Sequence, residues 1–250
     1  MFPMPFPRIS LLGVPIDAVT MGEAVTQMTA LLDRRECAHV MTPNSEMLVE
    51  AARNAQFRRV IQSAALNLPD SAGLLHAARW TRQRLPARVA GVDVVGAFCR
   101  TLNEQHPVFL LGGGPGIAAR AAHALQRANP SLRIVGTYAG SPSPAEAPDI
   151  IQRINASGAC VLFVAYGAPM QDLWINEHLR DFMTVRLAMG VGGTFDFLSG
   201  AVRRAPNFLR VAGLEWVWRL CLQPWRIRRI WNAAVVFPLL VLRYGRRSPF

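Results

Sequence analysis

The 250-residue sequence predicts an α/β protein: a mostly parallel sheet with helices on both faces, followed by a helical C-terminal appendage. Two observations lead to this prediction. Short β-rich runs recur through the first 200 residues, and each ends in small or polar residues before a helical pattern begins. The last fifty residues instead combine ten arginines with one acid. We therefore expect a main domain over residues 1–204 and a basic amphipathic appendage over residues 205–250.

The strand candidates are the β-rich runs that stand directly before polar turns. The five clearest are residues 38–41, 65–68, 108–111, 161–165 and 186–189. Repetition of strand, polar turn and helix is typical of a Rossmann-like, doubly wound sheet. Ligands of such sheets bind at the carboxyl ends of the strands, and this is where the polar turns fall. We therefore look for a binding site among these turns.

The appendage has the composition of a surface that meets anionic lipid or a phosphorylated amphiphile. Residues 201–250 hold ten arginines against the single acid Glu215, so they carry +9 of the net charge of +11, and they hold four of the six tryptophans. We expect one helix from Pro206 to about Cys221 and another that starts at Pro224. Apolar residues at helical spacing follow Pro224, with arginines beside them. The pattern predicts a membrane-associating helix.

The protein is expected to be cytoplasmic and peripheral on the inner face of the plasma membrane. The apolar run Trp231 to Tyr244 is shorter than the roughly 18 to 20 residues of a spanning helix. The start, Met1 to Pro7, does not have the pattern of a signal peptide. Four cysteines lie far apart without Cys-x-x-Cys spacing, which predicts reduced thiols and neither disulfides nor structural zinc.

The glycine turn from Gly112 to Gly116 lies between a strand and a helix. Its backbone amides suit a phosphate at a helix N-terminus, and Gly112 and Gly113 are the residues nearest the strand. The turn does not fit G-x-G-x-x-G, and no acid follows the next strand at Gly136-Thr137, which disfavours a dinucleotide dehydrogenase. A tight packing turn and a nucleotide-sugar diphosphate site both remain open.

Polar side chains at other strand ends are candidates for chemistry. Asp70 follows an apolar strand and suits a general base, although an aspartate in this place also commonly caps a helix. Thr42 and Asn44 suit sugar hydroxyls, or they cap the next helix. Asp196 suits a base or ribose, or it pairs with Arg203 or Arg204. The residues alone do not decide between these alternatives.

No Asp-x-Asp sequence occurs, so the usual carboxylate pair that holds a metal ion on a sugar-nucleotide diphosphate is absent. We expect neither a metal nor a cofactor. The charge that develops on a leaving diphosphate would then be met by arginines and backbone amides. Arg219, Arg226 and Arg229 of the appendage are the candidates, because the planar guanidinium fits phosphate oxygens. Solvated or lipid-facing charge is the alternative for each of them.

The ordered motifs from residue 10 to residue 230 resemble the WecG/TagA/CpsF glycosyltransferase family, or glycosyltransferase family 26. The matching segments are Thr42-Pro43-Asn44 with Glu46, Leu68 to Gly73, Arg88 with Gly91-Val92-Asp93, Leu110 to Gly113, Gly167 to Asp172, Gly190 to Gly200, Arg204-Ala205-Pro206 and Gly213 to Trp216. One departure is Ser71, where the family commonly has glycine. Each segment alone is weak, and the ordered set is specific.

The resemblance implies an inverting, metal-independent transfer of a hexose or N-acetylhexosamine from a UDP-sugar to a polyprenyl (undecaprenyl) diphosphate-linked sugar. By this likeness Asp70 is the general base, and Arg219, Arg226 and Arg229 stabilise the leaving diphosphate. The implied substrate contacts are Thr42, Asn44, Arg88, Gly112, Gly113, Gly167, Gln171 and Asp196. An anionic membrane surface is the implied partner, and a homo-oligomer is compatible with the family.

Two rival functions come from other classes. A pI near 11 with arginines and tryptophans suits a nucleic-acid-binding protein, but the interleaved apolar stripe would stay exposed on a nucleic acid. A scaffold that merely adheres to membrane would need no catalytic carboxylate. We therefore expect no nucleic acid partner.

Overall fold

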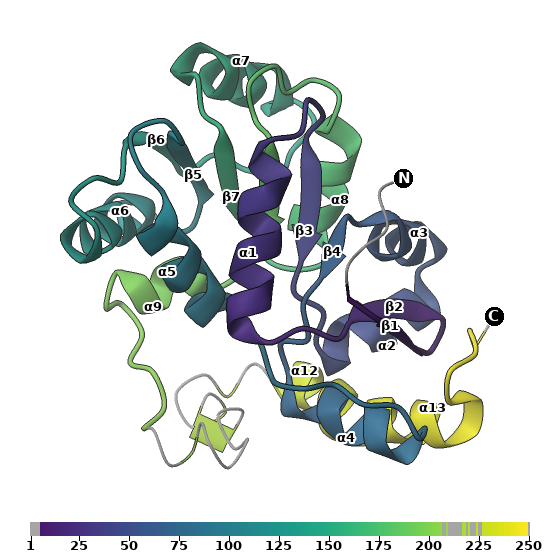
Figure 1. The fold of residues 1–250 in the computed structure, drawn as a ribbon. Helices are drawn as coiled ribbons and strands as arrows, with labels where there is room; N and C mark the ends of the chain where they lie inside the picture. Colours follow the sequence, from purple (N-terminus) through teal and green to yellow (C-terminus); the bar gives the residue numbers. More distant parts are fainter. Residues whose placement is uncertain are drawn as a thin grey trace.

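The computed structural model describes residues 6–206, 209, 217, 218, 220, 224 and 227–249. Their centre is a six-stranded, wholly parallel sheet in the order β4-β3-β8-β7-β5-β6 (Figure 1). The strands are β3 (Ala38–Met41), β4 (Leu66–Asn67), β5 (Val108–Gly112), β6 (Ile134–Tyr138), β7 (Val161–Ala165) and β8 (Leu187–Gly190). This confirms the predicted Rossmann-like α/β fold, and each of the five predicted strands is present.

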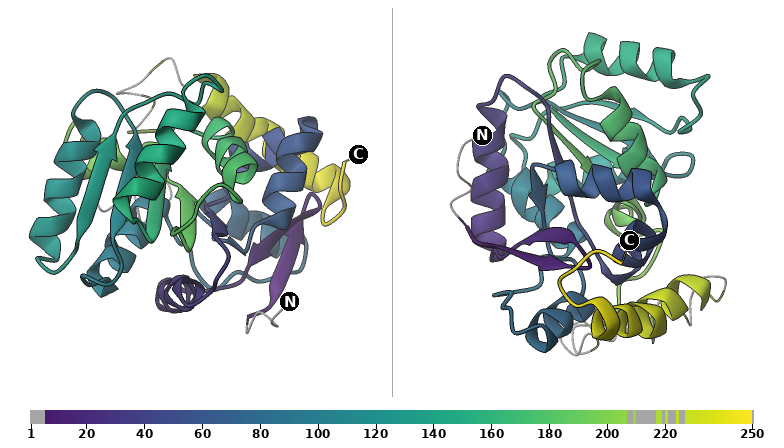
Figure 2. Two further views of the ribbon diagram at one scale, coloured as in Figure 1. Left: turned by 90° about the horizontal axis from the view of Figure 1, so that it is seen from above. Right: turned by 90° about the vertical axis from the view of Figure 1, so that its right-hand side faces the viewer.

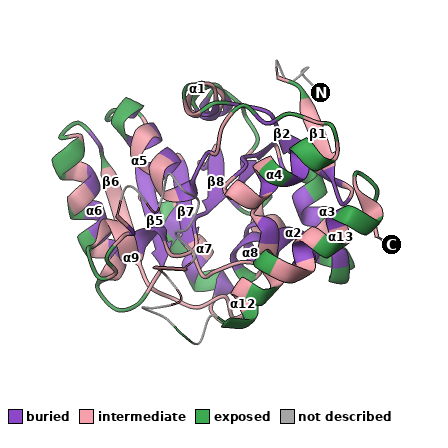
Figure 3. Ribbon diagram, turned by 90° about the horizontal axis from the view of Figure 1, so that it is seen from below, coloured by how far each residue is buried: buried purple, intermediate pink, exposed green. Residues whose placement is uncertain are grey.

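Helices cover both faces of the sheet (Figures 1 and 2). One face is covered by α1 (Met21–Leu32), α5 (Gly91–Thr101), α6 (Ile117–Ala128) and α9 (Thr194–Leu198). The other is covered by α7 (Ala147–Ser157) and α8 (Met170–His178), and α3 (Ala55–Ser63) packs beside α8. Successive residues such as Leu110 and Leu111 enter opposite cores. Burial on both sides explains why the strands read as continuous apolar runs (Figure 3).

A short antiparallel hairpin precedes the sheet and was not predicted. Its strands are β1 (Arg8–Leu11) and β2 (Val14–Asp17). The turn residues Leu12 and Gly13 both have positive φ, 52° and 76°, as two-residue hairpin turns require. The fully buried Asp17 carboxylate accepts from Arg8 Nε at 2.6 Å and from the backbone N–H of Asn67 at 2.7 Å. These bonds attach the hairpin to the edge strand β4.

The C-terminal helix is longer than its predicted apolar stripe. It runs through α12 (Ile227–Trp231), a π-helical turn, η2 (Asn232–Val236), and α13 (Phe237–Tyr244). It lies beside α2 (Ser45–Arg53) and α4 (Ala72–Trp80), at one end of the molecule (Figure 1). Most of the helix predicted to end near Cys221 lies outside the described residues. Within the described chain, no helix combines the length and apolarity needed to cross a membrane.

The end of the described chain returns to the hairpin. Leu12 N–H donates to Gly245 O at 3.0 Å, and Gly13 N–H donates to Arg246 O at 3.1 Å. The Arg246 guanidinium donates to Thr81 O, just past the end of α4. Phe237 and Val241 are 1% and 3% exposed in the cluster that also buries the hairpin. The last described turn of the chain is therefore bonded to the main domain.

Three of the four cysteines are described, and all three are free thiols. Burial raises the pKa of Cys37 and of Cys99 to about 12, and it also raises the pKa of Cys160. These thiols therefore stay protonated at neutral pH. Cys221 lies outside the described residues.

Candidate active site

The chain connections place a topological switch point at the carboxyl ends of β5 and β7. These strands are neighbours, yet α6 follows β5 on one face of the sheet and α8 follows β7 on the other. Such a divergence is the usual ligand position of a doubly wound sheet. The predicted contacts Gly112 and Gly113 end β5, and Gly167 follows β7. Because β5 and β7 are parallel neighbours, the two glycine turns that follow them lie at the same edge of the sheet.

The two glycine turns approach each other closely. Gly113 N–H donates to Ala165 O at 3.2 Å, and a Cβ on Gly112 would lie 2.8 Å from the Ala165 carbonyl carbon. Gly112 also has a φ of +97°, which L side chains rarely adopt. Gly112 is therefore needed for the close approach of the turn to β7, while packing of the helix on the strand by this turn stays a prediction. A tight backbone turn at the ligand edge is also what a diphosphate needs, so the diphosphate interpretation stays a prediction.

Gln171 joins the loops that follow β7 and β8. Its Oε1 accepts from Gly167 N–H at 3.1 Å and from Gly192 N–H at 2.9 Å, and the residue is only 4% exposed. These two bonds use both lone pairs of the amide oxygen. The structure thus gives Gln171 a positioning role, and direct contact with substrate stays a prediction.

A buried histidine and aspartate lie next to Gln171. His39 Nε2 on β3 is 3.4 Å from Asp172 Oδ1 on α8, and both residues are buried. Gln171 Nε2 contacts the other Asp172 oxygen at 3.4 Å. A Cβ on Gly190 would collide with Asp172 Oδ1 and with Gln171 Nε2, so a larger residue at this strand end would displace these two side chains. The sequence motif contained Asp172, but nothing in it indicated His39.

Asp70 lies at the end of β4 with its carboxylate at the start of a helix. Its Oδ1 accepts from the backbone N–H of Gly91, the first residue of α5, at 3.0 Å. Its own N–H donates to Pro43 O at 2.9 Å. The Asp70 carboxylate is therefore held by a backbone donor at the N-terminal end of α5. Ser71 stands at the N-cap of the adjacent helix α4, so Asp70 is not its capping residue.

Arg88 contacts Asp70, Thr42 lies close to the helix start that holds it, and Asn44 caps a neighbouring helix. Arg88 Nε donates to the backbone oxygen of Asp70 at 2.6 Å. A Cβ on Gly91 would lie 3.4 Å from Thr42 Oγ1, so the threonine hydroxyl is close to the start of α5. Asn44 caps α2, with its Oδ1 accepting from Met47 N–H at 3.0 Å. The capping alternative is therefore confirmed for Asn44, and its contact with sugar stays a prediction.

The departure at Ser71 has a structural use. Its hydroxyl accepts from Ser45 N–H at 3.2 Å and lies 3.1 Å from the Ser45 hydroxyl. These contacts tie the loop after β4 to the start of α2, on the same side as Asp70. The extra side chain therefore braces the two strand-end loops.

Arg229 is the one predicted diphosphate-binding arginine that the structure describes. Its Nε donates to both oxygens of Glu46, at 2.7 and 2.8 Å. Glu46 is in the first turn of α2, two residues after Asn44. The ion pair therefore brings the C-terminal helix to the Asp70 side of the site. Arg219 and Arg226 lie outside the described residues.

Asp196 lies in α9, beyond the end of β8, and it is half-buried. Its backbone oxygen accepts from Val202 N–H at 3.0 Å. Arg204, one of the two partners considered for it, makes a two-pronged ion pair with Asp93, with nitrogen to oxygen distances of 2.6 and 2.7 Å. The nucleotide contact of Asp196 stays a prediction.

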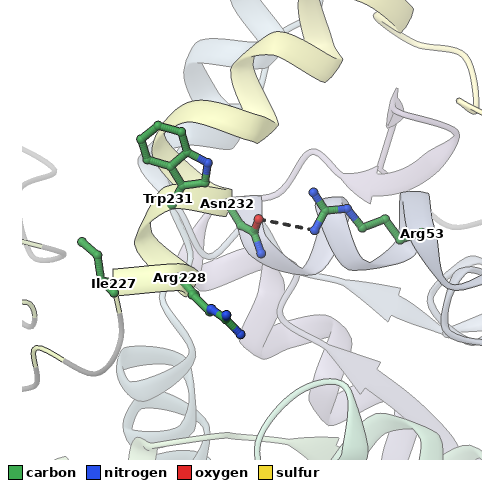
Figure 4. Close-up of a pocket in the computed structure, with 5 residues that line it drawn as sticks. All are labelled: Arg53, Ile227, Arg228, Trp231 and Asn232. Carbon is green, nitrogen blue, oxygen red and sulfur yellow. Dashed lines mark hydrogen bonds between the residues drawn. The ribbon is translucent and has the colours of Figure 1, made fainter.

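A cavity of about 400 Å³ lies between the end of α2 and the C-terminal helix. It is lined by Arg53, Ile227, Arg228, Trp231 and Asn232. Figure 4 shows the Arg53 guanidinium directed at Asn232, and the hydrogen bond between them is 3.4 Å long. Among the predicted site residues that the structure describes, none lines this cavity, which is open and basic.

These features define a Rossmann-like protein with a held carboxylate, a hydroxyl and glycine turns along its ligand edge, as a group-transfer enzyme requires. Residues 9–249 match the model of the Glycosyl transferase WecG/TagA/CpsF family. The chain belongs to this family, as the sequence motifs indicated. It is therefore a glycosyltransferase of a family that acts in cell-surface polysaccharide synthesis.

Metal ligands are not gathered in the described part of the chain. No group of three or more His, Cys, Asp or Glu side chains among those residues could hold a metal ion. Transfer without a metal ion stays a prediction.

Proposed function

We propose that this glycosyltransferase moves a hexose or N-acetylhexosamine from a UDP-sugar to a polyprenyl-diphosphate-linked sugar, with inversion and without a metal ion. The observation that carries the proposal is the Asp70 carboxylate, held by the first N–H of α5 at the carboxyl edge of the sheet. Thr42 and Arg88 lie beside it. The family membership supports a sugar donor and a sugar acceptor.

The chemical step is a single displacement. The acceptor hydroxyl oxygen forms a bond to the anomeric carbon while the bond from that carbon to the UDP oxygen breaks. Asp70 takes the hydroxyl proton, and UDP leaves with the bonding electron pair. A base of this kind contributes about 10² to 10⁴ in rate.

Arginines of the appendage would stabilise the negative charge on the departing UDP. The Nε bond of Arg229 to Glu46 uses one of its five N–H donors, so its terminal nitrogens have donors for phosphate oxygens. Arg219 and Arg226 are assigned the same role from sequence. Loss of one such donor typically lowers kcat about 10² to 10³. We expect Arg229→Gln to fall in this range and Arg243→Gln, on an exposed part of α13, to stay near wild type.

The decisive experiment replaces Asp70 with asparagine. The asparagine oxygen can still accept from Gly91 N–H, so the loop keeps its anchor, but the amide cannot take the proton. Turnover should fall about 10²-fold or more, while UDP affinity changes little. The assay uses a short-chain lipid diphosphate sugar and a panel of UDP-sugars, read by product mass.

Two results would overturn this assignment. Full turnover by the Asp70→Asn variant would show that Asp70 is not the general base. It would favour a protein that only adheres to membrane. Absence of any glycosyl product with the whole donor panel would reject the proposed substrates. The same panel identifies the donor sugar.

We further propose that the protein works on the cytoplasmic face of the membrane and that docking completes the site. The exposed side chains of Ile227 and Trp231, next to Arg228, support a lipid-facing surface on the C-terminal helix. Removal of residues 205–250 would also remove Phe237 from the core. The test therefore uses the intact enzyme, so that the core is not disturbed. Full activity of this enzyme without lipid or detergent would contradict docking-dependent activation.

A further inference from the structure

We propose that the ion pair between Asp93 and Arg204 positions the proposed catalytic base relative to the C-terminal appendage. Asp93 would then be a positioning residue for transfer. The inference rests on the proposed function of Asp70 and of the appendage arginines. It assigns a role to Asp93 and Arg204. In the proposed function, these two residues neither contact the substrate nor bind the diphosphate.

The pair has the geometry of a strong contact. Arg204 Nη1 donates to Asp93 Oδ1 at 2.6 Å, and Nη2 donates to Oδ2 at 2.7 Å. The Arg204 side chain is 24% exposed and the Asp93 side chain is 43% exposed. A two-pronged pair between a planar guanidinium and a carboxylate fixes orientation as well as distance. The contact therefore holds the backbone of both residues in one arrangement.

Asp93 belongs to the turn that holds the base. Gly91 begins α5 and donates to Asp70 Oδ1, and Asp93 is two residues further in the same first turn. Asp93 N–H donates to Ala90 O at 3.0 Å, which closes that turn. A displacement of Asp93 would therefore move the N–H that anchors the Asp70 carboxylate.

Arg204 stands where the appendage begins. The segment after α9 folds back through the bond from Val202 N–H to Asp196 O, and Ala205 is buried. The appendage that carries Arg219, Arg226 and Arg229 continues directly from this point. The ion pair thus links the turn that holds the base to the start of the segment proposed to receive the leaving diphosphate.

A purely superficial ion pair is the alternative, because exposed pairs are worth about 0 to 1 kcal/mol. The chain supplies a matched example in Arg153 and Asp149, whose side chains are 53% and 54% exposed and whose closest contact is 2.7 Å. That pair lies on α7, away from Asp70. Asp149→Asn is therefore the control for loss of one carboxylate charge.

The kinetic test is a double-mutant cycle of Asp93→Asn, Arg204→Gln and the combination. Each single variant should lower kcat roughly 10- to 100-fold, since a displacement of about 1 Å can cost about 10²-fold in rate. The double variant should be no slower than the singles, because the pair acts as a unit. Donor KM and UDP affinity should change less than about threefold, and Asp93→Glu should retain more activity than Asp93→Asn. Additive losses, or no loss beyond that of Asp149→Asn, would overturn the proposal.

A second readout does not need activity. Trypsin cleaves after arginine, and exposed Arg203 is an internal reference for its neighbour Arg204. In Asp93→Asn the Arg204 guanidinium loses its charged partner, so cleavage after Arg204 relative to Arg203 should rise at least severalfold by mass spectrometry. An unchanged ratio would show that the ion pair does not hold Arg204 in place. If the wild type transfers no sugar while the ratio rises in Asp93→Asn, the proposed function fails, but the structural role of the ion pair is supported.

Discussion

At the scale of single residues, Gln171 shows how one buried amide shapes the ligand edge. It supplies the acceptor for two glycine N–H groups that come from different loops. An N–H group that is fully buried without an acceptor costs about 1 to 3 kcal/mol, and the part-buried groups of Gly167 and Gly192 fall toward the lower end of this range. The geometry of the glycine turns after β7 and β8 therefore depends on this side chain.

We predict that Gln171→Ala destabilises the protein by about 2 to 4 kcal/mol, from the two unsatisfied donors, and raises donor KM. Urea unfolding and initial rates over a donor series measure the two effects. Gln152→Ala, on the exposed side of α7, is the matched control and should change neither. Unchanged stability together with unchanged donor KM would show that the loops after β7 and β8 keep their conformation without the Gln171 side chain.

The sequence alone predicted where candidate site residues lie, but not which residues they contact. Asn44 and Asp70 were correctly expected at strand ends, because polar residues after buried runs mark the carboxyl edge of a sheet. Whether each caps a helix depends on which N–H lies nearby, and for Asp70 that N–H belongs to Gly91, the first residue of α5, which is 21 positions away in the sequence. Arg229 and Glu46 are 183 positions apart, so no local pattern could pair them. The contact of His39 with Asp172 was missed for the same reason.

At the scale of elements, the buried strands were predictable because burial on both faces leaves an unbroken apolar run. The hairpin of β1 and β2 was not predicted, since its strands have four residues each and Pro15 interrupts the second. The C-terminal helix was predicted from its apolar stripe up to Val235. Its burial continues to Phe237 and Val241, which pack against a core made by distant residues.

This packing leads to a stability prediction. Phe237→Ala should lower the free energy of unfolding by about 3 to 5 kcal/mol, because it empties a buried site. Leu239→Ala, whose side chain is 60% exposed two positions along the same helix, should change it by less than about 0.5 kcal/mol. Urea unfolding of the intact chain compares them. Equal losses would mean that burial of the Phe237 side chain does not account for the effect.

At the scale of the whole molecule, four of the seven exposed large apolar side chains among the described residues lie on the C-terminal helix. Ile227, Trp231, Leu239 and Leu242 are each more than half exposed, and Trp80 on the adjacent α4 is 55% exposed. Arg246, by contrast, is used within the molecule by its bonds to Thr81 O. The composition of the appendage predicted the exposed surface, but not how many of its arginines serve the fold.

We predict that the intact protein co-sediments with anionic vesicles and that binding weakens as salt rises. Leu239→Glu with Leu242→Glu should reduce the bound fraction severalfold, because two charges would replace buried apolar contacts with lipid. Met183→Glu, at a 76% exposed residue between α8 and β8, is the control and should bind as wild type does. Equal sedimentation of wild type and double variant, or stronger retention by oligonucleotides, would favour the nucleic-acid alternative.

The bonds from the Leu12-Gly13 turn to Gly245 and Arg246 have a consequence during biosynthesis. The turn emerges from the ribosome early, whereas its partners are made more than 200 residues later. Until then, the apolar side chains that Phe237 will cover are open to water and to other nascent chains. We expect ribosome-bound chains that stop before residue 237 to need chaperone protection, and this can be followed by protease sensitivity of stalled chains of increasing length.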